Sequence, residues 1–449
     1  MATRFAPRDD ILSWGRVLRA QHLVARPQSR DEVSGLINEG VAAGHELLAT
    51  GLRRSYGDNG LNPGGALIDM AGLNRVIAFD PAARLLRAEA GISFDTLLQL
   101  LVPRGFFLPV TPGTQFVTLG GAIANDVHGK NHHRAGTIGR WVRRLGLIRS
   151  DGPELELGPS DDTGLFAATI GGLGLTGIIT WAEIEVIPIA GTMMDVETMP
   201  FASLDEFLAI ASESEEEFDY TVAWVDCLAR GNALGRGVFS RARHATSGPL
   251  MAERPRRAPS LPLDLPGFVL NGLTIRAFNT LYYHAARRRA GRATVAYEPF
   301  FYPLDAIGAW NRMYGGRGLY QYQSVVPPET ARDAIRTMLE VIAAAGEGSF
   351  LAVLKTFGDK PSPGVLSFPR AGITLALDFA NRGASTLALM ARLDAIVREA
   401  GGRLYPAKDG RMPAAMFRAG YSNWRDFAQY VDPAFSSHFW RRVGPEGEA

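Results

Sequence analysis

The sequence predicts an α+β protein made of three consecutive parts, residues 1–190, 191–400 and 401–449. In the first part, two glycine-rich turn clusters are separated by short strand-like runs, which indicates a compact mixed domain. In the second part, the spacing of apolar residues switches twice between a period of two and a helical period. This switching predicts an antiparallel sheet covered by helices on one face. The third part is mostly turn-forming and polar, with a short aromatic segment near its end.

In the first part, the predicted helices have apolar residues at helical spacing and a glycine at the C-terminal end. Turn signals such as Asp80-Pro81 and Asp151-Gly152 separate the predicted strands. The predicted helices are 30–44 and 94–105, and the predicted strands lie within 45–50, 66–70, 75–91, 139–152 and 178–189. A glycine-rich turn at 171–177 feeds the last of these strands.

In the second part, strands and helices follow one another with short connections. The predicted strands lie within 193–199, 220–229, 319–327, 349–358 and 373–380, and the predicted helices within 203–218, 330–346 and 386–402. Residues 250–292 differ from the rest, because prolines and apolar residues alternate there with eight arginines and only two acids. This composition predicts a mobile insertion with a solvated basic helix. The alternatives are a lid, or a surface that meets anionic lipid headgroups.

The composition excludes several classes of protein. A net charge of +1 gives no global basic excess, so we expect no nucleic-acid partner. The single cysteine, Cys227, excludes an internal disulfide framework and a multi-cysteine metal site. The N-terminal residues lack an apolar leader, and no apolar run is long enough to span a membrane. We therefore expect a cytoplasmic protein in a reducing compartment.

Lysine is rare in this chain. Of 47 basic residues only four are lysines: Lys130, Lys355, Lys360 and Lys408. Arginine stays charged in proteins, whereas a lysine amine can be tuned toward neutrality or placed as a compact charge. Each retained lysine is therefore a candidate functional residue, although codon bias alone would also leave a few.

Residues 109–134 form the most informative stretch. They are rich in glycine and histidine and poor in large apolar residues. Gly113, Gly120, Gly121 and Gly129 allow tight turns, whose freed backbone N–H groups can bind a diphosphate without cationic side chains. The stretch has neither a P-loop nor a GxGxxG motif between a strand and a helix. The alternative is a glycine-rich surface loop with solvated histidines.

Six motifs together resemble one known family. They are GLRRSYGDN (51–59), PGTQFVTLGGAIANDVHGKNHH (112–133), GGLGLTGII (171–179), QYQSVVP (321–327), LKTFG (354–358) and LYPAKDGR (404–411). The chain resembles the decaprenylphosphoryl-beta-D-ribose 2'-oxidase family, which carries a PCMH-type FAD-binding domain of the vanillyl-alcohol-oxidase superfamily. The resemblance implies a two-part FAD-binding domain at 1–190, a substrate domain at 191–400, and a C-terminal return at 401–449 that packs on the FAD domain. It also implies oxidation of a lipid-linked ribose.

The resemblance also implies where FAD lies. By motif position, the implied cofactor residues are Thr50, Gly51, Leu52, Arg53, Arg54, Ser55, Tyr56, Gly57, Asp58, Asn59, Gly113, Thr118, Leu119, Gly120, Gly121, Asn125, Asp126, Val127, His128, Gly177, Ile178, Ile179 and Tyr405. Many relatives in the superfamily tether flavin covalently through a histidine in the first loop. Tyr56 stands near that place here, so we expect non-covalent FAD.

The implied reaction moves a hydride to the flavin while the hydroxyl proton leaves. Lys408 matches a family lysine needed for turnover, and His128 and Tyr56 are candidates to orient the sugar hydroxyl. The candidate substrate-binding residues are Lys355, Gln321, Gln323 and Lys130. Gln321 and Gln323 share one strand face, and Lys355 would point into the cavity if its strand neighbours point away.

Two features qualify the site. A metal site at His128, His132 and His133 is not expected, because neither cysteines nor clustered carboxylates complete it. In the family a cysteine precedes the Asp-Phe of ITLALDF, whereas this chain has Ala376 there.

The implied partners are a lipid-linked sugar, a separate short-chain reductase that completes epimerisation to arabinose, and an inner membrane contacted peripherally through 250–292. The face of that membrane is left open. Two alternatives remain: an FAD-dependent oxidase or dehydrogenase of a soluble sugar, polyol or aldonolactone, and a flavin-binding protein without turnover.

Overall fold

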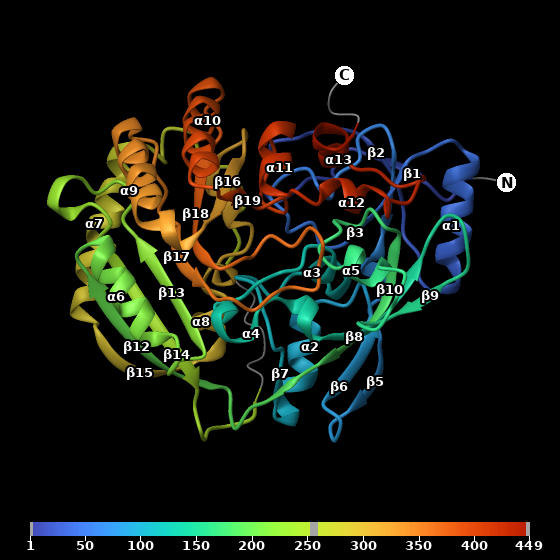
Figure 1. Ribbon diagram of the computed structural model, residues 1–449, viewed down its shortest axis with the longest axis horizontal. Coiled ribbons are helices and arrows are strands. Elements are labelled where there is room, and N and C mark those ends of the chain that lie inside the picture. The colour runs from blue at the N-terminus through green and yellow to red at the C-terminus, as the bar shows by residue number, and fades with distance from the viewer. Residues whose placement is uncertain (1–2, 252–258, 446–449) are drawn as a thin grey trace.

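The computed structural model describes residues 3–251 and 259–445 and confirms the α+β class. The chain forms two halves that meet along a central seam (Figure 1). The first small sheet has the strand order β1 (Ala6–Arg8), β2 (His22–Ala25), β4 (Ala66–Asp69) and β3 (Leu47–Thr50). Strands β2, β4 and β3 are parallel, and helix α1 (Asp31–Ala42) buries Val33, Leu36 and Ile37 in the same core as β3.

The second sheet of this half is antiparallel. Its strand order is β5 (Val76–Asp80), β6 (Leu85–Glu89), β10 (Ile178–Glu185), β8 (Val142–Ile148) and β9 (Leu155–Leu157). Helix α2 (Phe94–Leu101) begins at Ser93, whose hydroxyl accepts a hydrogen bond from the Thr96 N–H. The short elements of this half are β7 (Phe106–Phe107), α3 (Leu119–Ala124), α4 (His132–Ala135), α5 (Leu165–Thr169) and β11 (Ile187–Pro188).

An eight-stranded antiparallel sheet forms the other half, as the sequence predicts. Its order is β15 (Gly291–Ala296), β12 (Met193–Phe201), β14 (Gly237–His244), β13 (Tyr220–Val225), β17 (Ala352–Phe357), β18 (Gly372–Ala380), β16 (Leu319–Val326) and β19 (Arg403–Leu404). Strands β14, β15 and β19 were not among the predicted strands. Each of them pairs with a strand that the hydrophobic pattern does predict.

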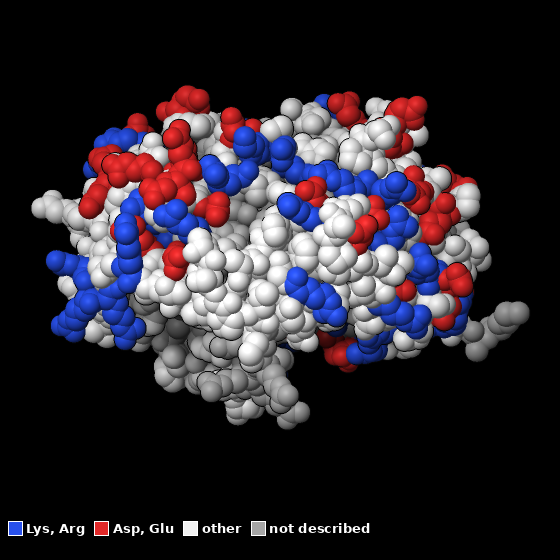
Figure 2. All heavy atoms as spheres, turned by 90° about the horizontal axis from the view of Figure 1, so that it is seen from below, with Lys and Arg blue, Asp and Glu red and all other residues white. Residues whose placement is uncertain are grey.

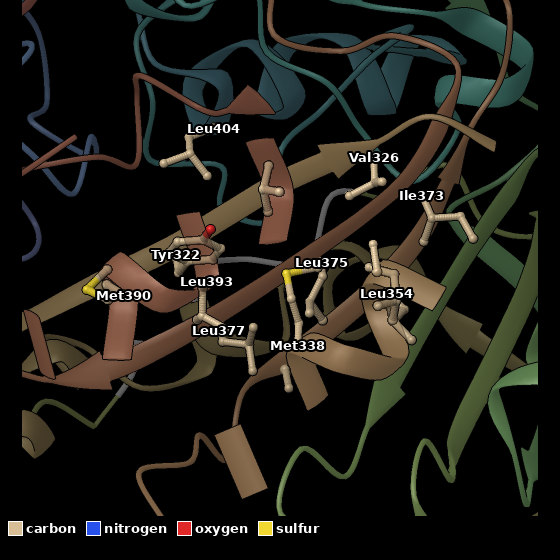
Figure 3. Packing of buried hydrophobic residues seen from close by; sticks show 14 of the residues in the cluster. Tyr322, Val326, Met338, Leu354, Ile373, Leu375, Leu377, Met390, Leu393 and Leu404 are labelled. Atoms are coloured by element: carbon tan, nitrogen blue, oxygen red, sulfur yellow. The ribbon is translucent and has the colours of Figure 1, made fainter. Parts of the chain in front are cut away.

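Helices α6 (Leu204–Ser214), α9 (Pro328–Ala345) and α10 (Ala384–Glu399) cover one face of this sheet. Leu354, Leu375 and Leu377 point from the central strands into the core beneath them, against Met338 and Leu393 (Figure 3). Burying one such side chain stabilises the fold by roughly 1.5–3 kcal/mol. Because side chains alternate along a strand, the residues between these leucines face the first half of the molecule.

Residues 259–292 include a basic helix with exposed arginines, as the sequence predicts, but one face of this helix is buried. Helix α7 (Gly272–Arg288) begins with a capping box at Asn271 and buries Ile275, Asn279 and Tyr283. The Asn279 amide donates to the carboxylate of Asp226 at 3.1 Å. The helix therefore packs on the domain through one face, while its basic residues stay in solvent. The prediction for residues 252–258 lies outside the described residues.

The C-terminal segment links the two halves. After β19 it forms α11 (Ala414–Gly420), α12 (Trp424–Ala428) and α13 (His438–Val443), which lie beside the first sheet in Figure 1. The Leu47 N–H donates to the Ala434 carbonyl at 2.7 Å. Arg442 and His438 both bind the buried carboxylate of Asp58.

Candidate functional site

A cavity of about 1310 Å³ lies between the two halves. One wall consists of loops from the first half, chiefly 49–61 and 111–130. The other consists of the face of the large sheet that the helices leave free, and the segment 297–310, which includes α8 (Tyr297–Phe301), closes one side. The volume exceeds that of an ordinary small-ligand pocket, so it can hold a dinucleotide and a second molecule.

Loop 50–60 lines one wall of the cavity with main-chain atoms. Arg53 has a left-handed φ of 53°, which bends the main chain sharply. Within the described residues, the N–H groups of residues 52–55 donate no hydrogen bond, and all four residues line the cavity. A Cβ placed on Gly57 would lie 1.3 Å from the carbonyl oxygen of Asp409, so the two backbones touch. Free donors on a bent backbone form a concave anion site.

The opposite part of the cradle begins at α3. Its N-cap residue Thr118 accepts a hydrogen bond from the Gly121 N–H at 3.2 Å. Beyond the helix, Asn125 is held from two sides. Its side-chain oxygen accepts from the Asn59 amide at 2.7 Å, and its carbonyl accepts from the Tyr405 hydroxyl at 3.0 Å. Three segments far apart in sequence therefore meet at this wall.

Most of the implied cofactor residues line the cavity, but four do not. Asp58 faces α13, and Leu119 and Ile178 belong to hydrophobic cores. Asp126 has a left-handed φ of 41° and accepts hydrogen bonds from Ser362, Ser367 and the Gly139 N–H. These residues hold the loops in place, and sequence spacing alone could not separate them from their cavity-lining neighbours.

The sequence GLGLTG at 172–177 has GxGxxG spacing, but it follows helix α5 and precedes strand β10. This order is the reverse of a Rossmann turn. Gly174 and Gly177 line the cavity instead, next to Ile179.

Three of the four lysines line the cavity: Lys130, Lys355 and Lys408. Burial, with a smaller effect of the Lys408 charge, lowers the pKa of Lys355 to about 7. Burial lowers the pKa of Lys408 to about 8, and Asp378 opposes this shift. The Lys408 ammonium lies 4.2 Å from the centre of the Tyr56 ring. Lys408 does not pair with its neighbour Asp409, whose carboxylate binds Arg442.

His128 lies beside Lys355. Its Nδ1 is 3.5 Å from the Lys355 Nζ, and its Nε2 is 3.1 Å from the Gln323 amide nitrogen. Burial and the charge of Lys355 hold the pKa of His128 well below its usual value, so the ring is neutral. Lys130 donates to the Phe300 carbonyl, and burial with the Lys355 charge lowers its pKa to about 7.

His132 and His133 are buried but do not line the cavity. His133 bonds the Phe218 carbonyl through Nε2 at 2.9 Å. In the part of the chain that the structure describes, no cluster of three or more potential metal ligands occurs.

The large sheet supplies a polar floor. Gln321 and Gln323 project from β16 into the cavity, and Ala376 of β18 lies opposite Gln323. Asp378, which the sequence reading missed, accepts a hydrogen bond from the Gln321 amide at 2.6 Å. The sequence did contain a signal for Asp378. In ITLALDFA it lies two residues after Ala376, and residues two apart on a strand share a face. Cys227 lies elsewhere, buried against Ser349, and burial raises the pKa of its thiol to about 12.

The residues present fit an FAD. Unpaired N–H groups at 52–55 suit the diphosphate, and a Cβ on Gly113 would meet no atom within 4 Å, which leaves room beside the backbone. Residues 21–158 match the family model of an FAD binding domain. The fold and this site define the chain as an FAD-dependent oxidoreductase.

Comparison with known proteins narrows the class. The chain is 37% identical over 450 aligned residues to the decaprenylphosphoryl-beta-D-ribose oxidase of Mycolicibacterium smegmatis, covering 96% of this chain and 97% of that protein. The chain therefore belongs to the decaprenylphosphoryl-beta-D-ribose oxidase family. More distant similarity links 46% of the chain to half of an alditol oxidase from Streptomyces sp., at 24% identity. A similar share, 39%, matches L-gulono-1,4-lactone dehydrogenase of Mycobacterium tuberculosis at 27% identity, over 40% of its length.

Among residues 3–251 and 259–445, no helix combines the length and the apolar character that crossing a bilayer requires.

Proposed function

We propose that this protein oxidises the 2'-hydroxyl of a polyprenylphosphoryl-beta-D-ribose to the 2'-keto sugar with bound FAD. The observation that carries the proposal is the lining of the cavity. Loops with free backbone donors form one wall, and buried Lys355 and Lys408 with Gln321 and Gln323 form the other. Similarity over nearly the whole length of the Mycolicibacterium smegmatis enzyme supports the same substrate class.

The flavin supplies the hydride acceptor for such a reaction. The cavity residues divide the remaining tasks by their pKa values, as paired acid–base groups do. Lys408, whose pKa is about 8, remains a cation at neutral pH and stabilises negative charge that develops beside it. Neutral His128 and Lys355, whose pKa is about 7, form the pair that takes the hydroxyl proton.

Anaerobic mixing tests the substrate class. We expect prenylphosphoryl-ribose to bleach the flavin absorbance of the purified protein, and alditols and aldonolactones to leave it unchanged. Bleaching by an alditol or lactone but not by the lipid-linked sugar would assign the second function, an oxidase of soluble sugars. Alditols are included in this experiment because part of the chain is similar to an alditol oxidase.

The ketone then needs a second protein. Reduction in the same cavity would restore ribose, because the walls that hold the sugar present the same face of C2 again. We infer that a separate short-chain reductase reduces the opposite face and completes the epimerisation to arabinose.

We also infer a peripheral membrane contact through α7 and the residues before it. Four large apolar side chains are unusually exposed there: Leu263, Phe268, Leu273 and Leu281, at 75%, 76%, 78% and 71%. Arg276, Arg287, Arg288, Arg289 and Arg292 accompany them. On the face seen in Figure 2, basic side chains also gather at this end of the molecule. Apolar residues beside a basic cluster suit an anionic bilayer surface.

The chain that leads into this surface borders the cavity. The Gly308 N–H donates to the Pro259 carbonyl at 2.9 Å, and the Leu261 N–H donates to the Gly308 carbonyl at 3.0 Å. Pro259 and Gly308 both line the cavity. A lipid-linked sugar could therefore enter from the bilayer without crossing water.

Vesicle flotation checks the contact. We expect the native protein to float with vesicles that contain anionic lipid, and the double variant Leu273→Ser/Leu281→Ser to lose at least half of this bound fraction while it keeps its flavin. Leu387→Ser on α10, which is 38% exposed, is the matched control and should float like the native protein. Equal flotation of the α7 variant would contradict the inference.

A further inference from the structure

Asp378 is a fully buried carboxylate next to the cavity, and the proposed chemistry gives it no task. It lies on β18 directly opposite Gln321 of β16, in the register of the antiparallel pair. Side chains at such positions are close enough to touch. Oδ1 of Asp378 accepts the Gln321 amide hydrogen bond at 2.6 Å, and the Asp378 N–H donates to the Ser349 hydroxyl at 3.3 Å.

The second oxygen of this carboxylate, Oδ2, is buried and has no hydrogen-bond partner among the described residues. Leaving such an oxygen unsatisfied costs about 1–3 kcal/mol. A leucine would avoid that cost. The positive charge that faces it is Lys408, and the hydroxyls of Tyr56 and Tyr314 also lie within its electrostatic reach.

A carboxylate beside a glutamine fixes the orientation of the glutamine side-chain amide. An ionised carboxylate only accepts hydrogen bonds, so the NH2 group of Gln321 must face Asp378 and the carbonyl oxygen must turn away. Gln321 also lies close enough to the Tyr56 hydroxyl to oppose the rise that burial causes in the pKa of Tyr56. Gln321 lines the cavity, which leaves its carbonyl oxygen as an acceptor there.

We propose that Asp378 is a positioning residue for the oxidation: it fixes the Gln321 amide so that the carbonyl oxygen faces the cavity and accepts a hydrogen bond from a substrate hydroxyl. The proposal rests on the proposed function only in requiring a substrate that bears hydroxyl groups. It adds that recognition needs a donor on the substrate at this position, which an ether or a deoxy sugar lacks.

The arrangement also depends on pH. Burial raises the pKa of Asp378 to about 7, and Gln321 and Lys408 oppose that shift. Above this pH the carboxylate is ionised and holds the amide. Below it, the protonated oxygen can donate to the Gln321 carbonyl, so the amide is free to turn over. As pH falls through 7, Lys408 keeps its charge and the tyrosines stay neutral, so neither reverses this effect. Lys130 and Lys355, whose pKa values are also about 7, gain charge in the same cavity.

The test is anaerobic flavin reduction by whichever compound bleaches the native protein, so a wrong substrate assignment does not affect it. For native protein, we expect the apparent substrate dissociation constant to rise as pH falls below about 7. In Asp378→Asn it should be raised about tenfold at pH 8, the loss of one hydrogen bond, and should rise less than in native protein as pH falls, because only the titration of the cavity lysines remains. The limiting rate of reduction should change less than the affinity.

Two further variants separate positioning from structural damage. Asp378→Asn combined with Gln321→Glu restores a donor–acceptor pair of reversed polarity and again presents an oxygen to the cavity, so affinity should recover to within about threefold of native. Asp394→Asn changes another buried carboxylate, which pairs with Arg411 away from the cavity, and should leave the affinity and its pH dependence unchanged.

Native affinity and native pH dependence in Asp378→Asn would overturn the proposal, as would a double variant that recovers nothing. If Asp378→Asn does not fold with flavin, Gln321→Met decides the matter. It keeps the carboxylate and removes the acceptor, so it should show the same tenfold weakening, and unchanged affinity in this variant would overturn the proposal.

Discussion

Replacing Lys408 with alanine should leave a yellow, folded protein whose flavin is reduced by substrate about 10²–10³ times more slowly, the usual effect of removing one charged or hydrogen-bonding group that stabilises a transition state. The ammonium lies in the cavity over the Tyr56 ring, with no carboxylate partner within ion-pair distance among the described residues. Its charge is therefore available to the reacting atoms. Stopped-flow absorbance of the flavin band measures the rate directly.

The pH dependence of that rate provides a second readout. Burial lowers the pKa of Lys408 to about 8, so the amine is protonated below that pH and loses its charge above it. The rate of flavin reduction in native protein should fall as pH rises through about 8, and Lys408→Ala should lack this decline. Lys360→Ala is the matched control, because Lys360 is the one lysine that does not line the cavity. Native rates in Lys408→Ala would remove this residue from the mechanism.

Gly57→Ala should yield a protein that retains little or no FAD. The added Cβ would overlap the Asp409 carbonyl oxygen at 1.3 Å, and both partners are backbone, so neither can move by a rotamer change. The adjacent hydrogen bond from the Tyr56 N–H to the Ala407 carbonyl, 3.1 Å long, would also be strained. Overpacking of this kind costs at least about 1–3 kcal/mol. The substitution displaces the cofactor loop and the Lys408 loop together.

The ratio of flavin to protein absorbance and the thermal midpoint check this expectation. Gly152→Ala is the control, because a Cβ there meets nothing within 4 Å and the residue lies in a hairpin turn outside the cavity. We expect the control to bind FAD fully. A Gly57→Ala protein with native flavin content and native melting would show that loop 50–60 need not contact the Asp409 segment.

Sequence reasoning predicted the parts of the site that depend on local periodicity. Gln321 and Gln323 share a face because strand side chains alternate, and Lys355 points into the cavity because Leu354 is committed to the core. Sequence reasoning could not place residues whose position depends on pairing between distant strands. Asp378 gains its place only from the register of β18 against β16, which no single segment encodes.

Dependence on distant contacts also explains why the sequence did not predict which loop residues face the cavity and how α7 packs. In the motifs around Asp58 and Asp126, neighbouring residues point to opposite sides of a bent backbone, and only the partners Arg442 and Ser367 show which side is which. The arginines of 250–292 predicted a solvated basic helix, and the arginines of α7 are exposed, but the helix also packs on β12 and β14 and buries Ile275 and Tyr283. Tertiary contacts decided both cases.

In the proposed reaction, a sugar hydroxyl meets the flavin beside Lys355, Lys408 and His128. The most direct measurement is to incubate the protein with prenylphosphoryl-ribose and an electron acceptor, reduce the product with borodeuteride, and locate the deuterium by mass spectrometry after hydrolysis. We expect deuterium at C2, in arabinose as well as ribose. Deuterium at another carbon, or none in a protein that retains its FAD, would contradict it.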